Sequence, residues 1–377
     1  MNIKKRILLF CHDGSSLGHL RRISRLGAEL QKDFSVLILT GMREATWISP
    51  IECGLVVIPS WSGIDAARAE RAGGKCWIEM SRCDAEQFRS KFISQTVDIF
   101  SPDLVIVDYL PFGQHRELSQ MLSSYVGKKF FLHRGMSDSS DAAILRGGAT
   151  LKFGATYDKI IVASDERLVD LALEDNYCEL ASQKIRYVGF IAPDVVPKRF
   201  IGEPVVVCSG GGGFGAERLM LACIEVAARL PNTSFKIILG PRSRIVSTRL
   251  EVSDNCEVYD VCEELPDFHS SSAITVTTGG YNSVMEAVRG GGHLIVCPNQ
   301  SGDDDEQIRF ADAIASHYPL TRIDDVAELE GVLKRALYNF ETRGRAVFPL
   351  RLNGLACIRE LVWSELTGSP GSSGNHL

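Results

Sequence analysis

Apolar residues occur in short runs, and each run is followed by a turn of glycine or polar residues and then by a stretch with helical spacing. In the first part of the chain these runs are Ile7–Phe10, Val36–Thr40 and Leu55–Pro59, and residues 20–30 give a helical stripe between the first two. This order predicts βαβ units and therefore a parallel sheet. Further strands are predicted at residues 100–108, 129–133, 160–163 and 185–188.

The second half of the chain repeats the pattern. Strands are predicted at residues 204–208, 235–239, 273–277 and 294–297, and helices at 217–229 and 348–366. A chain of 377 residues exceeds what one hydrophobic core usually supports, so we expect two α/β domains. The predicted parts are a first domain at 1–190, a Pro-containing linker at 191–203, a second domain at 204–345, a helical segment at 346–366 and a disordered tail at 367–377.

Composition limits the classes of function. The net charge is −6 and no long basic run is present, which argues against non-specific nucleic-acid binding. No apolar stretch reaches the roughly 20 residues of a transmembrane segment, and the run Ile7–Cys11 is too short for a signal peptide. The 11 cysteines form no CxxC pair, so we expect reduced thiols, a cytoplasmic location and no structural zinc.

Two glycine turns lie at the ends of predicted strands in the second half. Residues 210–213 are four consecutive glycines before a helix, and Gly279-Gly280 precedes another helix. Glycine lets backbone N–H groups approach an anion, and a helix directs its positive end at it. A flexible linker and close packing are the alternatives for these turns. The strand after the first turn leads to Gly240-Pro241-Arg242 without an acidic residue, which argues against a nicotinamide cofactor.

Titratable residues follow the strands of the first half. His12, Asp13 and His19 come after the first strand, and Asp108 and His133 end later strands. Open α/β sheets bind ligands at the carboxyl ends of their strands. An imidazole can take the proton of an attacking alcohol at neutral pH, while a helix cap or a turn group is the alternative role.

Three segments together resemble one enzyme family. The run from Gly279 to Glu286 is followed by Pro298 and Gln307, Gly18-His19 precedes Arg22, and the glycine turn spans residues 209–216. These segments resemble the G-G/A-x-[ST]-x-x-E segment, the G-H-x-x-R start and the G-G-S-Q-G-A turn of GT-B glycosyltransferases. The resemblance is to family 28 in particular, the family of the MurG-type peptidoglycan N-acetylglucosaminyltransferases.

The resemblance implies the GT-B fold, in which two Rossmann-like domains have parallel sheets that face a central cleft. The second domain would bind the nucleotide sugar, and residues 346–366 would cross back to the first domain. In this interpretation Glu286 holds the ribose, Glu306 and Gln307 contact the sugar, and Val261 and Cys262 flank the uracil. The expected donor site consists of Gly211, Gly212, Gly213, Phe214, Gly215, Arg242, Val261, Cys262, Gly279, Gly280, Asn282, Ser283, Glu286, Glu306 and Gln307.

The first domain would supply the catalytic base and the acceptor site. By resemblance His19 is the base or a contact to the donor phosphates, and Asp13 is the competing base because this turn departs from the family's G-G-T-G-G-H. Residues 61–89 lie where GT-B enzymes insert acceptor-binding loops. The candidate acceptor contacts are His12, Trp61, Trp77, Asp108 and His133.

The implied reaction is direct displacement with inversion, without metal or cofactor, of a sugar from a UDP-sugar to an acceptor hydroxyl. UDP-N-acetylglucosamine is the first donor expected, and the acceptor is a small molecule of natural-product biosynthesis or a lipid-linked compound. The acidic run Asp303–Glu306 could bind a cation, although the family is generally metal-independent. The alternatives are a nucleotide-sugar hydrolase, a sugar-nucleotide 2-epimerase and a non-catalytic nucleotide-sugar-binding protein. Both a monomer and a homodimer are compatible with the sequence.

Overall fold

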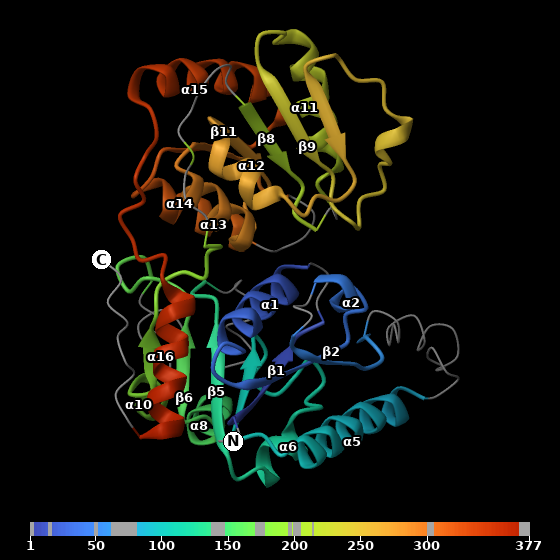
Figure 1. Cartoon of the computed structure of the whole chain (residues 1–377), viewed down its shortest axis with the longest axis vertical. Coiled ribbons are helices and arrows are strands. Elements are labelled where there is room, and N and C mark those ends of the chain that lie inside the picture. Colours follow the sequence, from blue (N-terminus) through green and yellow to red (C-terminus); the bar gives the residue numbers. More distant parts are fainter. Residues whose placement is uncertain are drawn as a thin grey trace. The chain divides into compact units, whose positions relative to one another are not determined.

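The computed structural model describes residues 4–13, 17–48, 52–61, 81–136, 148–169, 178–194, 198, 205–212, 215–299 and 305–368. The chain divides into two compact units. The first contains Met1–Gly135, Ala143–Gly189 and Asn353–Leu377, and the second contains Met136–Ala142 and Phe190–Leu352. Each unit is built around one parallel sheet with helices packed on it (Figure 1).

The sheet of the first unit has the order β3-β2-β1-β4-β5-β6-β7, and all neighbouring strands are parallel. Its strands are β1 (Arg6–Cys11), β2 (Ser35–Thr40), β3 (Gly54–Val57), β4 (Leu104–Asp108), β5 (Lys128–His133), β6 (Lys159–Val162) and β7 (Ile185–Tyr187). The strand order reverses between β1 and β4, because the chain adds β2 and β3 on one side of β1 and later strands on the other.

The sheet of the second unit has the order β10-β9-β8-β11-β12-β13, again parallel throughout. Its strands are β8 (Val205–Ser209), β9 (Ser234–Ile238), β10 (Cys256–Tyr259), β11 (Ile274–Thr277), β12 (His293–Val296) and β13 (Leu320–Arg322). Here the order reverses between β8 and β11.

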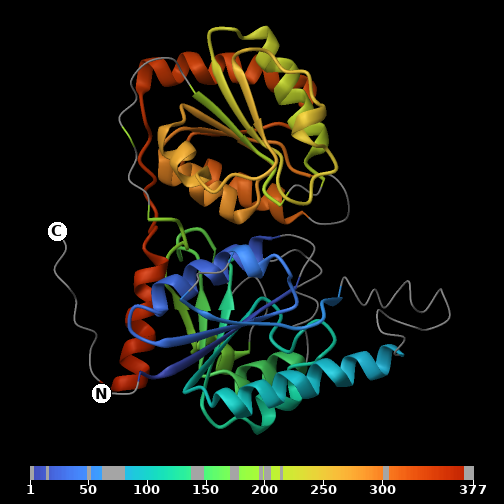
Figure 2. The same ribbon diagram turned by 45° about the vertical axis from the view of Figure 1, so that its right-hand side comes forward.

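Helices cover the two faces of each sheet, as right-handed crossovers require when the strand order reverses. Figure 2 shows α1 and α5 on opposite faces of the first sheet, and α11 and α13 on opposite faces of the second. The helices of the first unit are α1 (Gly18–Leu30), α2 (Ala45–Ile48), α5 (Arg82–Phe100), α6 (Ser119–Ser124), α8 (Gly148–Thr156), α10 (Glu179–Ser182) and α16 (Gly354–Thr367). Those of the second unit are α11 (Glu217–Arg229), α12 (Leu265–Ser271), α13 (Tyr281–Gly290), α14 (Glu306–Ala315) and α15 (Leu329–Arg343). None of these described helices is long and apolar enough to cross a membrane.

The central strands are apolar on both faces because helices cover both sides of the sheet. β4 is buried at every position, and β1 is buried at all positions after Arg6. In the second unit the same burial holds for β11, and the core continues into α11 and α15 through Met220, Leu333 and Phe340. The sheet centres are therefore rigid supports for the turns that follow their strands.

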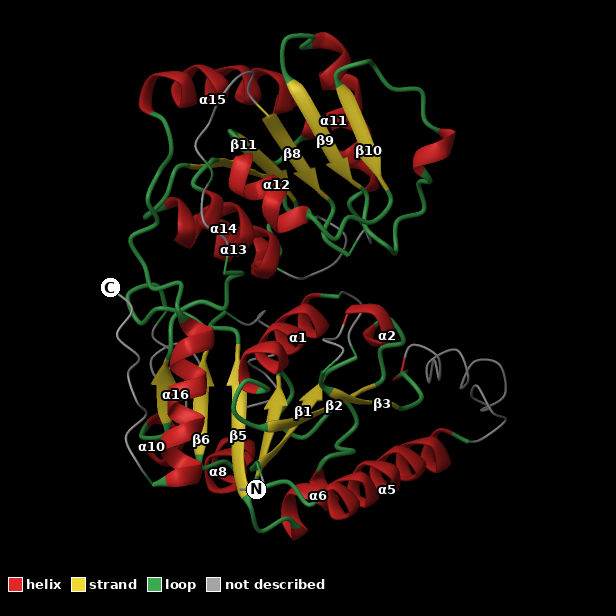
Figure 3. Cartoon of the chain, viewed as in Figure 1, coloured by secondary structure: helices red, strands yellow, loops and turns green. Residues whose placement is uncertain are grey.

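The predicted strands are confirmed to within one or two residues at each end (Figure 3), except that the strand predicted at 100–108 begins only at Leu104, because Phe100 still belongs to α5. The helix predicted at 348–366 is wrong at its start, because α16 begins only at Gly354. Pro349 explains the difference, since proline disfavours helical backbone at the preceding residue. The loop expected at 61–89 is also corrected in its last part, where α5 begins at Arg82 with Ser81 as its cap.

Helices α12 and α13 pack so closely that Gly290 has no room for a side chain. A Cβ atom at this position would lie 2.2 Å from the backbone oxygen of His269. We expect Gly290→Ala to lower the free energy of unfolding by about 1–3 kcal/mol, because the two helices must move apart. Denaturant unfolding of the full chain measures this change.

Gly331→Ala is the matched control. Gly331 lies at an exposed position of α15, and the nearest atom to an added Cβ is the end of the Arg335 side chain at 3.6 Å. This substitution should raise stability by about 0.5–1 kcal/mol through the helix propensity of alanine. A Gly290→Ala protein as stable as the wild type would contradict the close packing.

Candidate functional site

In each sheet the candidate residues follow the two strands at which the strand order reverses. In the first unit these strands are β1, which leads to His19, and β4, which ends at Asp108. In the second unit they are β8 and β11, which lead to the two glycine turns. Turns that leave neighbouring strands toward opposite faces open a space at the carboxyl edge of the sheet, where α/β proteins bind ligands.

The first unit joins His19 and Asp108 in a buried pair. His19 is the second residue of α1, and its Nδ1 lies 2.8 Å from Oδ2 of Asp108 at the end of β4. Arg22, one turn further along α1, donates from Nε to Oδ1 of Asp108 at 3.1 Å and also bonds this oxygen through Nη2. Asp108 is fully buried and His19 is 7% exposed. The expected acceptor contact by Asp108 is therefore corrected: its carboxylate is occupied by His19 and Arg22.

These contacts indicate which nitrogen of His19 carries the proton. Nη2 of Arg22 lies 3.1 Å from Nδ1 of His19, but an arginine can only donate. A carboxylate can only accept, and its distance to Nδ1 is shorter, so we assign the hydrogen to Nδ1. The lone pair on Nε2 is then the one that can receive a proton.

Burial keeps His19 neutral. It lowers the pKa of His19 to about 3, and Arg22 acts in the same direction while Asp108 opposes it. Burial alone would raise the pKa of Asp108, but Arg22 and His19 more than offset this and hold it well below its usual range. The pair is therefore a neutral imidazole backed by a charged carboxylate, the arrangement of a general base.

Tyr109 is a further residue of this site that sequence reasoning did not single out. Its φ of +69° is unusual for a residue with a side chain and stores about 1–3 kcal/mol of strain. Its ring lies 4.5 Å from that of His19 and 5.1 Å from that of His12, with the Arg134 guanidinium 4.8 Å from its centre. The strained backbone thus places an aromatic ring beside the base, and no sequence pattern marks such a conformation.

Asp13 lies in a separate buried network. Its carboxylate forms an ion pair with Arg89 of α5 at 3.0 Å and accepts a hydrogen bond from the Trp61 backbone at 2.7 Å. Arg89 is fully buried and lies 3.5 Å from Glu117 as well. Both oxygens of the Asp13 carboxylate therefore already accept hydrogen bonds, one from Arg89 and the other from the Trp61 backbone.

Trp61 belongs to the same network and is 5% exposed. Its indole N–H donates to Glu117 at 2.7 Å, and its ring lies between the Arg89 guanidinium at 4.5 Å and the His115 ring at 4.4 Å. The expected stacking of Trp61 on an acceptor is therefore corrected, because both partners already cover it. Trp61 is an anchor of the chain at the end of β3.

The remaining acceptor candidates of the first unit are histidines at strand ends. His133 ends β5, and its Nδ1 accepts a hydrogen bond from the Gly135 backbone at 3.0 Å. Burial lowers the pKa of His133 to about 3 with help from Arg134, and burial also lowers the pKa of His12. These neutral rings can exchange hydrogen bonds with an acceptor.

In the second unit the first glycine turn lies close against neighbouring strands. A Cβ on Gly210 would lie 2.6 Å from the backbone oxygen of Leu239, and Gly211 and Gly215 have φ of +61° and +76°. The Gly211 N–H donates to Oγ of Ser209 at 3.3 Å. The backbone N–H groups of Gly210 and Gly211 are therefore already used within the protein.

The second glycine turn starts α13. Gly279 has φ of +90°, and Gly280 caps the helix with extended backbone. A Cβ on Gly280 would meet no described atom within 4 Å, and Oγ of Ser283 would lie 3.6 Å from a Cβ on Gly211. The open start of α13 and the first glycine turn thus lie next to each other.

The loop that follows β12 lies against these two glycine turns. The Asn299 backbone donates to Oε1 of Gln307 at 2.9 Å, and a Cβ on Gly215 would lie 2.0 Å from Nδ2 of Asn299. A Cβ on Gly279 would lie 3.7 Å from Cβ of Gln307. The turns after β8, β11 and β12 therefore converge, and Asn299 joins the predicted residues as one that sequence reasoning missed.

The other expected donor residues have varied surroundings. Glu286 on α13 is 1% exposed, and Glu306 at the start of α14 is 9% exposed. The Arg242 backbone donates to Gly212 at 3.0 Å, which places Arg242 beside the first glycine turn. Val261 is 47% exposed after β10, with Cys262 half-buried next to it. Gly213, Phe214, Trp77, Asp303 and Asp304 lie outside the described residues.

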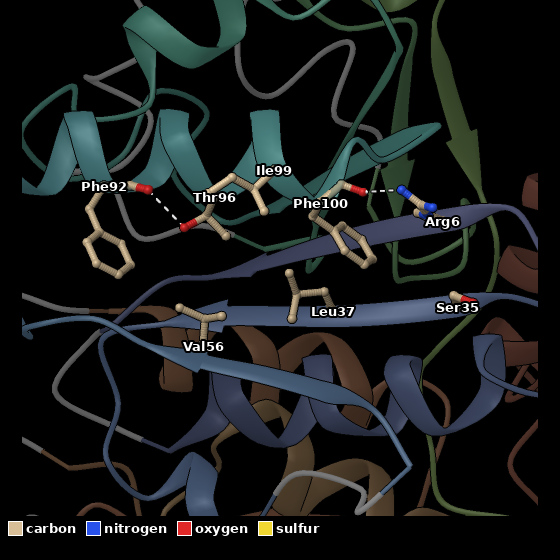
Figure 4. A pocket seen from close by; sticks show the side chains of 8 residues that line it. All are labelled: Arg6, Ser35, Leu37, Val56, Phe92, Thr96, Ile99 and Phe100. Atoms are coloured by element: carbon tan, nitrogen blue, oxygen red, sulfur yellow. Dashed lines mark hydrogen bonds between the residues drawn. The ribbon is translucent and has the colours of Figure 1, made fainter.

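An apolar cavity of about 550 Å³ lies elsewhere in the first unit, between α5 and the sheet (Figure 4). Its lining residues are Arg6, Ser35, Leu37, Val56, Phe92, Thr96, Ile99 and Phe100. Arg6 and Ser35 are the first residues of their strands, whereas His19 and Asp108 follow the carboxyl ends. The cavity is therefore separate from the candidate site.

Comparison with known proteins identifies the second unit. Residues 205–342 match the glycosyltransferase family 28 C-terminal domain. A comparison with curated protein sequences finds no similar protein.

Solved structures share the fold over nearly the whole chain. The calicheamicin glycosyltransferase CalG4 has a TM-score of 0.61 at 16% identity, covering 98% of this chain and 99% of that chain. Phytolacca americana UGT2, complexed with UDP-2-fluoroglucose and pterostilbene, has a TM-score of 0.61 at 12% identity. The match covers 96% of this chain and 100% of that chain. A putative UDP-N-acetylglucosamine 2-epimerase from Listeria monocytogenes has a TM-score of 0.62 at 12% identity, with 97% of each chain covered. Residues 205–342 thus match a glycosyltransferase family 28 C-terminal domain, and the chain as a whole has the GT-B fold of these solved structures.

Proposed function

We propose that this protein is a glycosyltransferase that moves a sugar from a UDP-sugar to a hydroxyl group of a small-molecule acceptor, with inversion at the anomeric carbon. The observation that carries the proposal is the His19–Asp108 pair, a neutral imidazole with a carboxylate behind it. The family 28 C-terminal domain supports a nucleotide-sugar donor on the second unit.

In this proposal Nε2 of His19 takes the proton of the acceptor hydroxyl as its oxygen attacks the anomeric carbon. The new carbon–oxygen bond forms while the bond to the diphosphate breaks, and the diphosphate leaves with the bonding electrons. Asp108 stabilises the imidazolium through Nδ1–H. A single displacement from the side opposite the leaving group inverts the anomeric configuration.

Backbone donors would stabilise the leaving diphosphate. In this proposal the N-terminal turns of α13 and α11 donate backbone N–H groups to the diphosphate. Donors that are already oriented lower the cost of developing negative charge. This is why we propose a reaction that needs no metal ion and no cofactor.

The donor is proposed to be a UDP-sugar, with UDP-N-acetylglucosamine as the first candidate. Glu286 would accept both ribose hydroxyls, which suits a ribonucleotide better than a deoxyribonucleotide. The printed complex of Phytolacca americana UGT2 with UDP-2-fluoroglucose supports a UDP donor on this fold. The acceptor is proposed to be a natural product such as an antibiotic core or a cyclitol, which the calicheamicin glycosyltransferase supports.

His19→Ala tests the base directly. Loss of a general base should lower kcat about 10²–10⁴-fold, whereas UDP affinity should stay unchanged because the donor residues belong to the other unit. Steady-state kinetics and calorimetry with UDP measure the two effects. His317→Ala, which removes a histidine beyond α14, is the control and should leave both unchanged. A His19→Ala enzyme with the wild-type kcat would exclude His19 as the base.

Arg22→Met tests the electrostatics of the base. Because Arg22 lowers the pKa of His19, its removal should raise that pKa. A base acts only when neutral, so wild-type kcat/KM should stay level as the pH falls from about 8 to about 5.5, whereas the variant should lose activity in this interval. Arg25→Met on the same helix is the control and should keep the wild-type profile. Identical profiles for Arg22→Met and wild type would contradict the assignment.

Glu286→Gln tests the ribose contact. Hydrogen bonds to a charged group contribute about 1.5–3 kcal/mol, so UDP affinity should fall about 10–100-fold. Affinity for 2′-deoxy-UDP should fall less, because this ligand lacks one of the two hydroxyls. Calorimetry with both ligands measures the difference, with the exposed Glu251→Gln as control. A variant with wild-type preference for UDP would show that Glu286 does not hold the ribose.

A further inference from the structure

We infer that His269 is a positioning residue for Glu286 and thereby determines the preference of the donor site for a ribonucleoside diphosphate. This inference rests on the proposed function, in which Glu286 holds the ribose. His269 lies on α12, which precedes β11, so neither glycine turn contains it. It belongs to none of the motifs that carry the family resemblance.

The geometry places the imidazole against the carboxylate. Nε2 of His269 lies 3.6 Å from Oε2 of Glu286, and the two side chains are 1% and 0% exposed. This distance is longer than a hydrogen bond. The edge of the imidazole therefore lies against one oxygen of the Glu286 carboxylate.

The neighbours of His269 select its tautomer. Nδ1 lies 3.1 Å from Oγ1 of Thr275, and the Ser272 hydroxyl donates to the backbone oxygen of His269 at 3.0 Å. Oγ1 of Thr275 also lies 3.4 Å from the Ser272 hydroxyl, and because its contact with Nδ1 is the shorter of the two, we assign the Thr275 hydroxyl as donor to Nδ1. A neutral ring then carries its hydrogen on Nε2, which faces Glu286.

An N–H that faces one oxygen has a definite effect on a buried carboxylate. It offsets part of the cost of burying the charge, and it fixes the plane of the group. A fixed plane is what recognition of two adjacent hydroxyls requires, because both must meet lone pairs of one carboxylate. Pyrophosphate contacts at the glycine turns are independent of this plane.

Gly290 makes this arrangement sterically feasible. The backbone oxygen of His269 lies 2.2 Å from the place of a Cβ at Gly290, one helical turn after Glu286 on α13. Any side chain there would push α12 away and carry the imidazole with it. The close approach of the helices and the ribose contact therefore depend on the same glycine.

The experiment is calorimetric titration of the full chain with UDP and with 2′-deoxy-UDP, for wild type, His269→Met, His269→Gln and Glu286→Gln. We expect wild type to bind UDP about 10-fold or more tightly than 2′-deoxy-UDP. His269→Met should reduce this ratio to below about threefold, because methionine fills the space without a donor. His269→Gln should retain most of it, since the amide N–H can replace Nε2–H.

If His269 were only structural, its replacement by methionine would weaken the binding of UDP and of 2′-deoxy-UDP equally. A His269→Met protein with the wild-type ratio of affinities would therefore overturn the inference. If His269→Met does not fold, Thr275→Val takes its place: a fall in the ratio supports the inference and an unchanged ratio overturns it. An unchanged ratio in Glu286→Gln, or no UDP binding by wild type, would overturn the proposed donor site together with the inference. Loss of the ratio in Glu286→Gln but not in His269→Met would overturn only the role of His269.

Discussion

The reversal of strand order in each parallel sheet is the constraint on which the candidate sites depend. β1 and β4 send their turns to opposite faces of the first sheet, and β8 and β11 do so in the second. Backbone at these carboxyl edges is therefore not covered by the next helix of the same crossover. The His19–Asp108 pair of the first unit and the glycine turns of the second occupy these two equivalent places.

Buried charge sets the properties of the base. The carboxylate of Asp108 is fully buried, which would be costly without Arg22 and His19 as partners. Arg22 stabilises this charge in the folded protein, but it also lowers the pKa of His19. The same guanidinium thus adds to the effect of burial, which is the main cause of the neutral imidazole. Such a compromise is common where two titratable groups share a buried site.

The fold was predictable from the sequence to a large extent. Apolar runs such as Leu104–Val107 predict strands that are buried on both faces of the sheet. Glycine turns predict where the backbone bends sharply or approaches a neighbouring segment. Helix α16 shows the limit of such predictions. The apolar pattern extended through Pro349, but the helix begins only at Gly354.

The pairing of site residues was much less predictable. His19 and Asp108 were each expected at a strand end, but 89 positions separate them and only the sheet order brings them together. The buried networks of Asp13 with Arg89, and of His269 with Glu286, were not foreseen for the same reason. The spacing of apolar residues predicts whether a residue is buried, but it does not predict which residue of another helix or strand it contacts. No sequence pattern predicted the positive φ of Tyr109, because strain of this kind is imposed by the surrounding tertiary structure.

The most direct test of the account is a mass-spectrometric and NMR assay of the purified protein with UDP-N-acetylglucosamine and related UDP- and dTDP-sugars. Each donor is incubated with and without pooled small-molecule acceptors, in the presence of EDTA. The account predicts an acceptor that gains one sugar from a UDP donor with inverted anomeric configuration, and little free sugar without acceptor. Release of free sugar at the same rate without acceptor, or conversion of the donor to its 2-epimer, would contradict it.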